Sequence, residues 1–558
     1  MAVVLGSMIP VAATADEAET ESYVWVRSSD PTTLQEPGEP YQGTNTLPAG
    51  VSGALEPPEP ETPTPEYEAE ALKRSGATYG SDTETKFHPL VDVIDFAGCN
   101  ASPEGKTDNG FIVNHFEFCR WNYNTLTKLN GQGRVEGQVR FKETEVGEGH
   151  NNGRQGTLNV KVTDVRTTGV FVGASMTLSP TSRGYPGVCT TSFGTSGSYT
   201  EPLSTWNNTF VYYRITSTAA DGDQSRIDKP TTCNFRNNWK VNGTKGSSEW
   251  FAAPDQSLRM DSAEYLKRGA TQGLEGAIFN RVTPWLSYDY ADASVKQVAE
   301  HIFTAYLIPE STDPRVDHAK KIPGRLGSST FLTRNYPKFD AAAKKVSDEN
   351  LKWKNAACGQ LVKGNATYEC DEFPFASTKE GAATGNFSVR YVPGTVNSTA
   401  GGRLSAWYAR DRILHGDKFQ VLAKNHGKLV PATLVIKSSG EYKMALDVAS
   451  RTAGSPARIY TYSSGPSQDF WHNDDGQLRV FSNSCLDASA GTAGTAVKAE
   501  PCSGADSQIW GPSTDYRGAI LHRRSGLCLA LKASPPVERT PIILSPCTGM
   551  ANQIWVVT

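Results

Sequence analysis

The pattern of hydrophobic and polar residues changes along the 558-residue chain. Between about residues 88 and 255, apolar and polar residues alternate in short runs such as VEGQVRF and GTLNVKVTDV, and turns rich in Gly, Asn and Ser separate these runs. Alternation with a period of two is typical of strands that bury one face. The pattern therefore predicts an all-β domain, a sandwich or barrel, over residues 87–255.

After about residue 256, apolar residues recur at the spacing of a helix. The stretches SAEYLKRGATQGLEGAIF and ASVKQVAEHIFTAYL show this spacing, and KFDAAAKKVSDENLKW has the composition of a surface helix. The runs SVRYV and KFQVLA are strand-like. Residues 256–425 are therefore predicted to form an α+β domain.

The last part of the chain, residues 426–558, repeats a motif. Three segments contain a Leu-Asp or Leu-Ala step and end in Gln-x-aromatic, at Gln468, Gln508 and Gln553. These glutamines lie 40 and 45 residues apart. Such repetition indicates units that complete one another's core, so this region is predicted to be a further domain.

The first 86 residues differ in composition from the rest. The opening MAVVLGSMIPVAATADEAE places an apolar stretch before small residues, which predicts the remnant of a secretory signal over residues 1–20. Residues 21–86 contain PPEPETPTPEYEAE, and the first 86 residues hold 15 acidic against 4 basic side chains. Prolines and like charges predict an extended, disordered acidic tail or linker here. Elsewhere no stretch approaches the ~20 apolar residues of a membrane span, so none is predicted.

Ten cysteines in a chain with an export-like start favour disulfide bonds and an extracellular location. A structural zinc site would need C-x-x-C spacings and nearby histidines, which the sequence lacks. The order of the cysteines pairs neighbours along the chain: Cys99 with Cys119, Cys189 with Cys233, Cys358 with Cys370, Cys485 with Cys502, and Cys528 with Cys547.

The stretch ECDEFPFASTKEGA, residues 369–382, concentrates acidic side chains that could carry chemistry. Asp371 and Glu372 are adjacent, so on a strand they point to opposite faces. Glu380 follows nearby, and Asn397 is expected in a Gly-bounded loop. Carboxylates with an amide oxygen suit Mg²⁺, Mn²⁺ or Ca²⁺, and such an ion can polarise a phosphodiester. On residue types alone, an ordinary charged turn beside a disulfide remains the alternative.

Basic residues surround this acid cluster. Residues 256–425 hold 23 Lys and Arg against 18 Asp and Glu, a sign of charge that suits an anionic polymer. The candidates for phosphate contacts are Lys379, Arg390, Arg403, Arg410 and Arg412, although each alone is typical of a solvated surface charge. The histidines are expected to be packing or surface residues, because the sequence gives no partner to His301, His318 or His415.

The order of residues in this region resembles the NucA/NucB family of secreted bacterial deoxyribonucleases. DEFP at 371–374, Glu-Gly at 380–381 and Asn-x-x-x-Gly at 397–401 follow the order of the family signature. The resemblance covers about residues 330–422. It implies a secreted endonuclease that hydrolyses DNA phosphodiesters with a divalent metal, Mg²⁺ or Mn²⁺ above all.

The resemblance also implies roles for individual residues. Asp371 is the first candidate for the catalytic acid or base. Glu372 and Glu380 are catalytic candidates for metal binding or water activation, and Asn397 is a candidate for orienting metal or phosphate. The metal ligands expected first are Asp371 and Glu380.

The C-terminal repeats resemble the ricin B-type β-trefoil lectins, in which each repeat carries a Gln-x-Trp turn. A competent repeat of that family offers an Asp to sugar hydroxyls and an aromatic ring for stacking. The first repeat here has both, Asp447 and Tyr460, whereas the second has Glu500 at the stacking position and the third has Ala530 in place of the Asp. The resemblance implies glycan binding at the first repeat, with a purely structural trefoil as the alternative.

Two other classes of function stay open. A glycoside hydrolase would use two carboxyl groups ~5–10 Å apart across a sugar cleft, which adjacent residues on opposite strand faces fit poorly. A non-enzymatic carbohydrate-binding or adhesion protein would use the trefoil and keep the acid cluster as structure.

Overall fold

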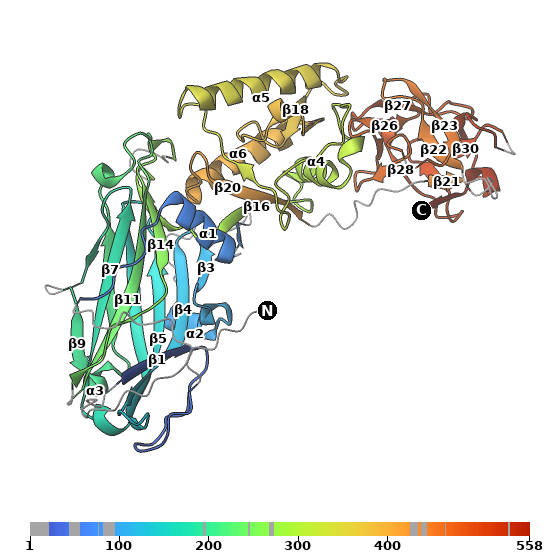
Figure 1. The fold of residues 1–558 in the computed structure, drawn as a ribbon. Helices are drawn as coiled ribbons and strands as arrows, with labels where there is room; N and C mark the ends of the chain where they lie inside the picture. The colour runs from blue at the N-terminus through green and yellow to red at the C-terminus, as the bar shows by residue number, and fades with distance from the viewer. Residues whose placement is uncertain are drawn as a thin grey trace, which may run out of the picture. The chain divides into compact units, whose positions relative to one another are not determined.

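The computed structural model describes most of the chain, in two compact units (Figure 1). The first unit contains residues 1–77, 90–264 and 272–282, and the second contains residues 78–89, 265–271 and 283–558. Among the described residues, no helix is long and apolar enough to cross a membrane. The described residues are 22–43, 56–75, 78–81, 95–193, 197–243, 246–266, 273–424, 434–436, 444–463, 465–533 and 536–557.

Two seven-stranded antiparallel sheets form the first unit. One sheet contains β1 (Ser22–Ser28), β3 (Phe111–Asn114), β4 (Glu117–Leu129), β5 (Val135–Glu148), β6 (Gln155–Thr167), β8 (Thr190–Ser192) and β10 (Phe210–Thr216). The other contains β7 (Ser175–Tyr185), β9 (Tyr199–Pro202), β11 (Thr231–Gly243), β12 (Gly246–Ser247), β13 (Phe251–Ala252), β14 (Gln256–Asp261) and β15 (Gly276–Phe279). The ring centroids of Phe141 in β5 and Trp239 in β11 lie 5.0 Å apart. The sheets therefore pack face to face, and the predicted β domain is confirmed as a sandwich.

Part of the predicted acidic tail is folded. Ser22–Ser28 pairs with β4, because the run SYVWVRS alternates and buries Trp25 in the sandwich. Residues Pro65–Ser75 form helix α1, whose Glu68 accepts an ion pair of 2.8 Å from Arg281. The prediction of an extended segment is wrong for these residues. The predicted signal remnant, residues 1–20, lies outside the described residues.

The boundary predicted at residue 256 is also wrong. Strands β14 and β15 belong to the sandwich, and the second unit takes up the chain again at Thr283. Among its described residues, the stretch predicted as a helix after residue 261 forms a short 3-10 turn, Glu264–Leu266, and then β15. All four residues of β15 are buried, so pairing with β14 outweighs the helical spacing of the sequence.

The described residues of the second unit before residue 425 form a four-stranded sheet, a hairpin and three helices. The sheet has the order β17-β20-β16-β2, with bounds Leu332–Thr333, Lys418–Lys424, Thr283–Asp289 and Thr78–Ser81. The hairpin consists of β18 (Tyr368–Phe373) and β19 (Ser388–Pro393). The helices are α4 (Lys296–Leu307), α5 (Ala341–Gly359) and α6 (Gly394–Arg410), and the first two form where the sequence predicts helices.

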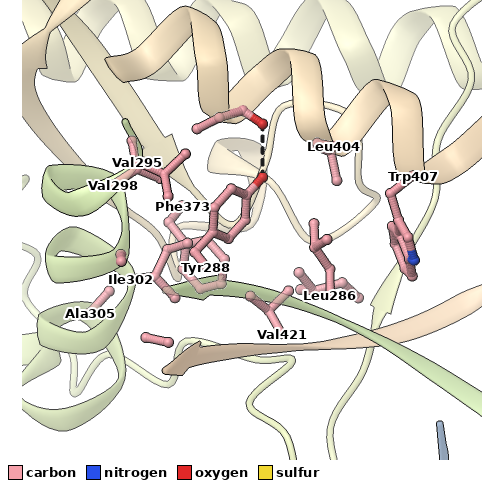
Figure 2. Packing of buried hydrophobic residues seen from close by; sticks show 14 of the residues in the cluster. Leu286, Tyr288, Val295, Val298, Ile302, Ala305, Phe373, Leu404, Trp407 and Val421 are labelled. Carbon is pink, nitrogen blue, oxygen red and sulfur yellow. Dashed lines mark hydrogen bonds between the residues drawn. The ribbon is translucent and has the colours of Figure 1, made fainter. Parts of the chain in front are cut away.

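A hydrophobic core joins α4, α6 and the sheet (Figure 2). Val298 and Ile302 of α4 meet Leu404 of α6 around the buried ring of Tyr288 from β16. The hydroxyl of Tyr288 donates to the carbonyl of Ala400 at 3.0 Å, which satisfies a buried polar group. This core fixes α4 and α6 beside the hairpin.

Residues 434–557 form the C-terminal trefoil, a set of short antiparallel strands. In each repeat the predicted glutamine bonds to the backbone of its own hairpin: Gln508 accepts from the Ser503 amide at 2.8 Å and donates to the Pro501 carbonyl at 3.0 Å. Gln468 and Gln553 make the equivalent bonds. The strands are β21 (Leu434–Ile436), β22 (Met444–Val448), β23 (Ser455–Thr461), β24 (Trp471–His472), β25 (Leu478–Val480), β26 (Ser484–Asp487), β27 (Lys498–Pro501), β28 (Trp510–Pro512), β29 (Ile520–His522), β30 (Leu527–Leu531), β31 (Ile542–Ser545) and β32 (Trp555–Val557).

All five predicted disulfide bonds are confirmed. Cys358–Cys370 joins the last turn of α5 to β18, directly before Asp371. This covalent link holds the strand that carries the acid cluster.

Candidate active site

The register of the β18–β19 hairpin separates the two adjacent acids. Asp371 lies opposite Arg390, and Phe373 lies opposite Ser388. Residues that oppose each other in antiparallel strands point to the same face, and α4 and α6 contact β18. The side chain of Glu372 points to the other face of the hairpin, so the predicted opposition of the two acids is confirmed.

Asp371 is held by a histidine from α4. The Nδ1 atom of His301 lies 2.7 Å from Oδ2 of Asp371, and Nε2 lies 2.7 Å from Oγ of Ser388. The side chain of His301 is fully buried, whereas 12% of the Asp371 side chain is exposed. The expectation that His301 has no partner is therefore wrong.

The hydrogen bonds define the protonation of this pair. Burial lowers the pKa of the His301 imidazole, and the hydrogen bond to Asp371 opposes this effect without cancelling it. The ring is therefore neutral near pH 7. A neutral imidazole donates at one nitrogen and accepts at the other, so with Nδ1–H donating to the carboxylate of Asp371, Nε2 accepts from the Ser388 hydroxyl. Among the described residues, Oδ1 of Asp371 accepts no hydrogen bond.

Asn397 lies on the same side of the hairpin. It belongs to the first turns of α6, so the expected loop is wrong, and its Nδ2 donates to Oε2 of Glu369 at 3.0 Å. Glu369 and Asp371 are two residues apart on β18 and share a face. The amide and the two carboxylates offer hard oxygen atoms of the kind that Mg²⁺ and Mn²⁺ prefer.

The described residues contain no group of three or more His, Cys, Asp and Glu side chains that could hold a metal ion. A closed protein cage is therefore absent from the described part of the chain. Mg²⁺ commonly keeps several waters and uses one or two carboxylates. The oxygens of Asp371, Glu369 and Asn397 therefore suit Mg²⁺ better than they suit Zn²⁺.

Glu372 and Glu380 are not brought to Asp371 by any observed contact. Oε1 of Glu372 accepts from the Ala382 amide at 3.2 Å, while its buried Oε2 has no partner among the described residues. Burial raises the pKa of Glu372 to about 8, helped by the charge of Asp371. Glu380 accepts from the amide and the hydroxyl of Thr333, at 2.6 and 2.8 Å. Glu372 therefore lies in the core, and Glu380 fixes a loop; a metal-binding role for Glu380 stays a prediction.

The five predicted DNA contacts divide by exposure. Arg390 and Arg412 are fully buried, so the prediction that they contact DNA is wrong for this structure. Arg390 pairs with buried Glu300 at 3.1 Å, and burial lowers its pKa to about 10, which leaves it charged. The partly or fully exposed candidates are Lys379, Arg403, which pairs with Asp292 at 2.6 Å, and Arg410, which pairs with Asp411 at 2.9 Å.

The other two histidines behave as expected. His318 is half exposed beside Asp317. His415 stacks on Phe339 with ring centroids 4.1 Å apart, and its Nδ1 accepts from the Tyr336 amide.

The predicted sugar site of the trefoil is filled by its own side chains. Asp447 is buried, accepts from Nε of Arg458 at 2.7 Å and accepts from Oγ of Ser467 at 2.8 Å. The guanidinium of Arg458 also lies 5.0 Å from the ring centroid of Tyr460. A sugar at this position would have to compete with Arg458 for both the carboxylate and the ring.

Comparison with known proteins identifies two families. Residues 324–422 match the family described as "Deoxyribonuclease NucA/NucB". Residues 432–555 match the family described as "Ricin-type beta-trefoil lectin domain". No curated protein matches the chain.

Solved structures similar to the chain include β-trefoil proteins. The designed three-fold symmetric protein ThreeFoil is 27% identical over 23% of this chain and 96% of its own, with a TM-score of 0.20. The agglutinin from Abrus precatorius is 18% identical over 23% of this chain and 48% of its own, with a TM-score of 0.21. The earthworm R-type lectin C-half, in complex with GalNAc, is 18% identical over 23% of this chain and 96% of its own, with a TM-score of 0.20.

The chain thus joins a nuclease domain to a lectin domain. The first is a NucA/NucB-type deoxyribonuclease domain, and the second is a ricin-type β-trefoil lectin domain. The match to the deoxyribonuclease family begins at residue 324, so α4 and His301 lie outside it. The polar residues His301 and Thr304, three positions apart beside the apolar Val298 and Ile302, are the sequence signal that could have pointed to a partner for this histidine.

The buried carboxyl group of Glu372 predicts a pH-dependent stability. Its pKa in the folded protein, about 8, lies above the ordinary value of 4.5. Folding therefore favours the protonated form, and the stability from this group is present below about pH 4.5 and is lost as the pH rises through about 8. Glu372→Gln keeps a neutral group of the same shape. It should raise the Tm little at pH 5 and by several degrees at pH 9, since one pKa unit corresponds to about 1.4 kcal/mol.

The measurement is calorimetry of the full chain at both pH values. Glu349→Gln is the control, because Glu349 is an exposed carboxylate on α5. An equal change in Tm at pH 5 and pH 9 for Glu372→Gln would contradict the assignment.

Proposed function

We propose that the protein is a secreted, metal-dependent endonuclease that hydrolyses DNA phosphodiester bonds, and that its trefoil binds glycans. The observation that carries the nuclease proposal is the buried hydrogen bond between His301 and Asp371, inside a unit that contains a deoxyribonuclease family match. This bond orients one carboxylate oxygen and leaves the other to meet a substrate. The five disulfide bonds support an extracellular location.

In the proposed mechanism, Asp371 is the general base. Its Oδ1 atom takes a proton from the water that attacks phosphorus, while Oδ2 stays bonded to His301. The P–O bond to the leaving deoxyribose oxygen breaks, and that oxygen takes a proton from solvent. A divalent ion held by the oxygens of Glu369 and Asn397, beside Asp371, would polarise the phosphodiester and lower the pKa of a bound water. The bond from Nδ2 to Oε2 of Glu369 fixes the side-chain amide of Asn397.

The surface of α6 next to Asn397 has room for a substrate. Gly401 lies one turn after Asn397 on the same helix face, and a Cβ atom there would meet nothing within 4 Å. Packing within the protein therefore does not require a glycine at this position. Arg403, Arg410 and Lys379 would supply contacts to DNA phosphates, which fix the position of the strand rather than its sequence.

The glycoside hydrolase alternative loses support. That chemistry needs two carboxyl groups that face one another across a sugar. Asp371 and Glu372 lie on opposite faces of β18, and Glu372 is buried against the Ala382 amide. Of these two residues, only Asp371 is partly exposed, and a single such carboxylate fits a general base better than an acid–nucleophile pair.

Replacement of Asp371 tests the nuclease proposal. Asp371→Asn keeps the size of the side chain but removes the base, so the rate of plasmid cleavage in Mg²⁺ or Mn²⁺ should fall by roughly 10²- to 10⁴-fold. Asp317→Asn, at a fully exposed carboxylate, is the control and should cleave at the wild-type rate. Equal cleavage by wild type and Asp371→Asn, with both folded by circular dichroism, would sink the proposal.

Replacement of Tyr460 tests the glycan proposal. A ring that stacks on sugar should give a Tyr460→Ala variant that binds immobilised glycans roughly 5-fold more weakly, since aromatic stacking contributes about 1 kcal/mol. Tyr462→Ala is the control, because Tyr462 is exposed two residues further along the chain. The assay is a glycan array with the full chain. Equal binding by the two variants would contradict a sugar site at Tyr460.

A further inference from the structure

Helix α4 carries a buried polar face that the family match does not include. Glu300, His301 and Thr304 are buried on this helix, beside Val298 and Ile302 of the hydrophobic core. A buried polar side chain costs free energy unless it is hydrogen-bonded, and an apolar residue would fill the same space without that cost. The hydrogen bonds of the His301 ring offset this cost.

The imidazole of His301 is fixed at both nitrogen atoms. Nδ1 bonds to Asp371 on β18 and Nε2 bonds to Ser388 on β19, each at 2.7 Å. Ser388 is itself fully buried. Because Ser388 lies opposite Phe373, it shares a face with Asp371, and the ring spans the two strands of the hairpin. A ring bonded at both ends cannot rotate or flip without the loss of a hydrogen bond.

The contact with Asp371 is one-sided. Oδ2 accepts a hydrogen bond from Nδ1–H of His301, while Oδ1 has no hydrogen-bond partner among the described residues. The Asp371 side chain is 12% exposed. The carboxylate is thus held from the core side and open on the other. This arrangement suits a base whose free oxygen must stand in one position, because a displacement of about 1 Å costs about 10²-fold in rate.

We propose that His301 is a positioning residue for Asp371, and that Ser388 in turn fixes the ring of His301. This inference rests on the proposed nuclease function and deepens it. His301 does not touch the substrate; it holds the carboxylate that does. The loss of such a supporting hydrogen bond should therefore lower kcat by roughly 10- to 100-fold and leave KM for DNA within about 3-fold.

Two amide replacements of His301 separate a positioning role from a packing role. In His301→Asn, the side-chain amide stands near the place of Nδ1 and can still donate to Asp371. In His301→Gln, the amide stands near the place of Nε2 and reaches toward Ser388 instead. Both variants put a neutral polar group in the same buried space, so their effects on stability should be alike.

The experiment measures kcat and KM for plasmid cleavage by the full chain, with the Tm of each variant as a check on folding. We expect His301→Asn to keep kcat within about 10-fold of wild type, and His301→Gln to lose roughly 10- to 100-fold. Equal kcat values for the two variants, or a change in KM with kcat unaltered, would overturn the proposal.

Ser388→Ala provides a second test if replacements of the buried histidine fail to fold. It removes one hydroxyl and creates little space, and it should lower kcat by roughly 10-fold, at the low end of the effect of a lost supporting bond. An unchanged kcat in folded Ser388→Ala would contradict the role of the ring. If the wild type does not cleave DNA, the nuclease proposal itself fails. If the wild type and His301→Gln cleave equally well and Asp371→Asn does not cleave, only the positioning role fails.

Discussion

The alternation of side chains along β18 is the constraint on which the candidate site depends. Asp371 faces α4 and α6, where His301 bonds to it and where part of its surface is exposed. Glu372 faces a small apolar cluster that includes Cys358 and Val389, where its charge is disfavoured. A shift of one residue in the pairing with β19 would exchange the two environments. The disulfide Cys358–Cys370 and the bonds of β19 hold the register that leaves one acid partly exposed and the other buried.

The buried charges behind the site extend into the trefoil. Glu300, next to His301 on α4, pairs with Arg390 at 3.1 Å and with Arg479 of the trefoil at 3.4 Å. Arg390 also donates to the hydroxyl of Ser482 at 3.2 Å. Removal of one partner from such a cluster leaves an uncompensated buried charge, which is strongly destabilising. The segment that matches the deoxyribonuclease family and the segment that matches the lectin family therefore share a polar core within the second unit. This shared core explains why the two segments form one compact body.

Much of the local structure could be predicted from the sequence, because it depends on short patterns. Alternation located the strands of the sandwich, the order of the cysteines paired the disulfides, and repetition located the glutamines that close each trefoil hairpin. The strand β15 could not be predicted, since its apolar residues also fit a helical spacing and only its pairing with β14 decides the matter. Trp25 was likewise hidden in a segment whose charge and prolines dominate its composition.

The candidate site was predictable only in part, for a related reason. The signature residues Asp371 and Asn397 lie on one side of the hairpin and helix, as a shared role requires. The partner of Asp371 comes from 70 residues earlier in the chain, on a helix outside the signature. The burial of Arg390 and Arg412 could not be predicted from their charge, because the sequence does not show whether a basic residue has a buried acidic partner.

The most direct measurement is the conversion of supercoiled plasmid by the purified, oxidised full chain in Mg²⁺, in Mn²⁺ and in EDTA. The account predicts nicked and then linear DNA with either metal, and intact plasmid in EDTA, with activity restored when excess metal is added back. Intact plasmid in all three conditions, from protein with five disulfide bonds and a cooperative unfolding transition, would contradict it.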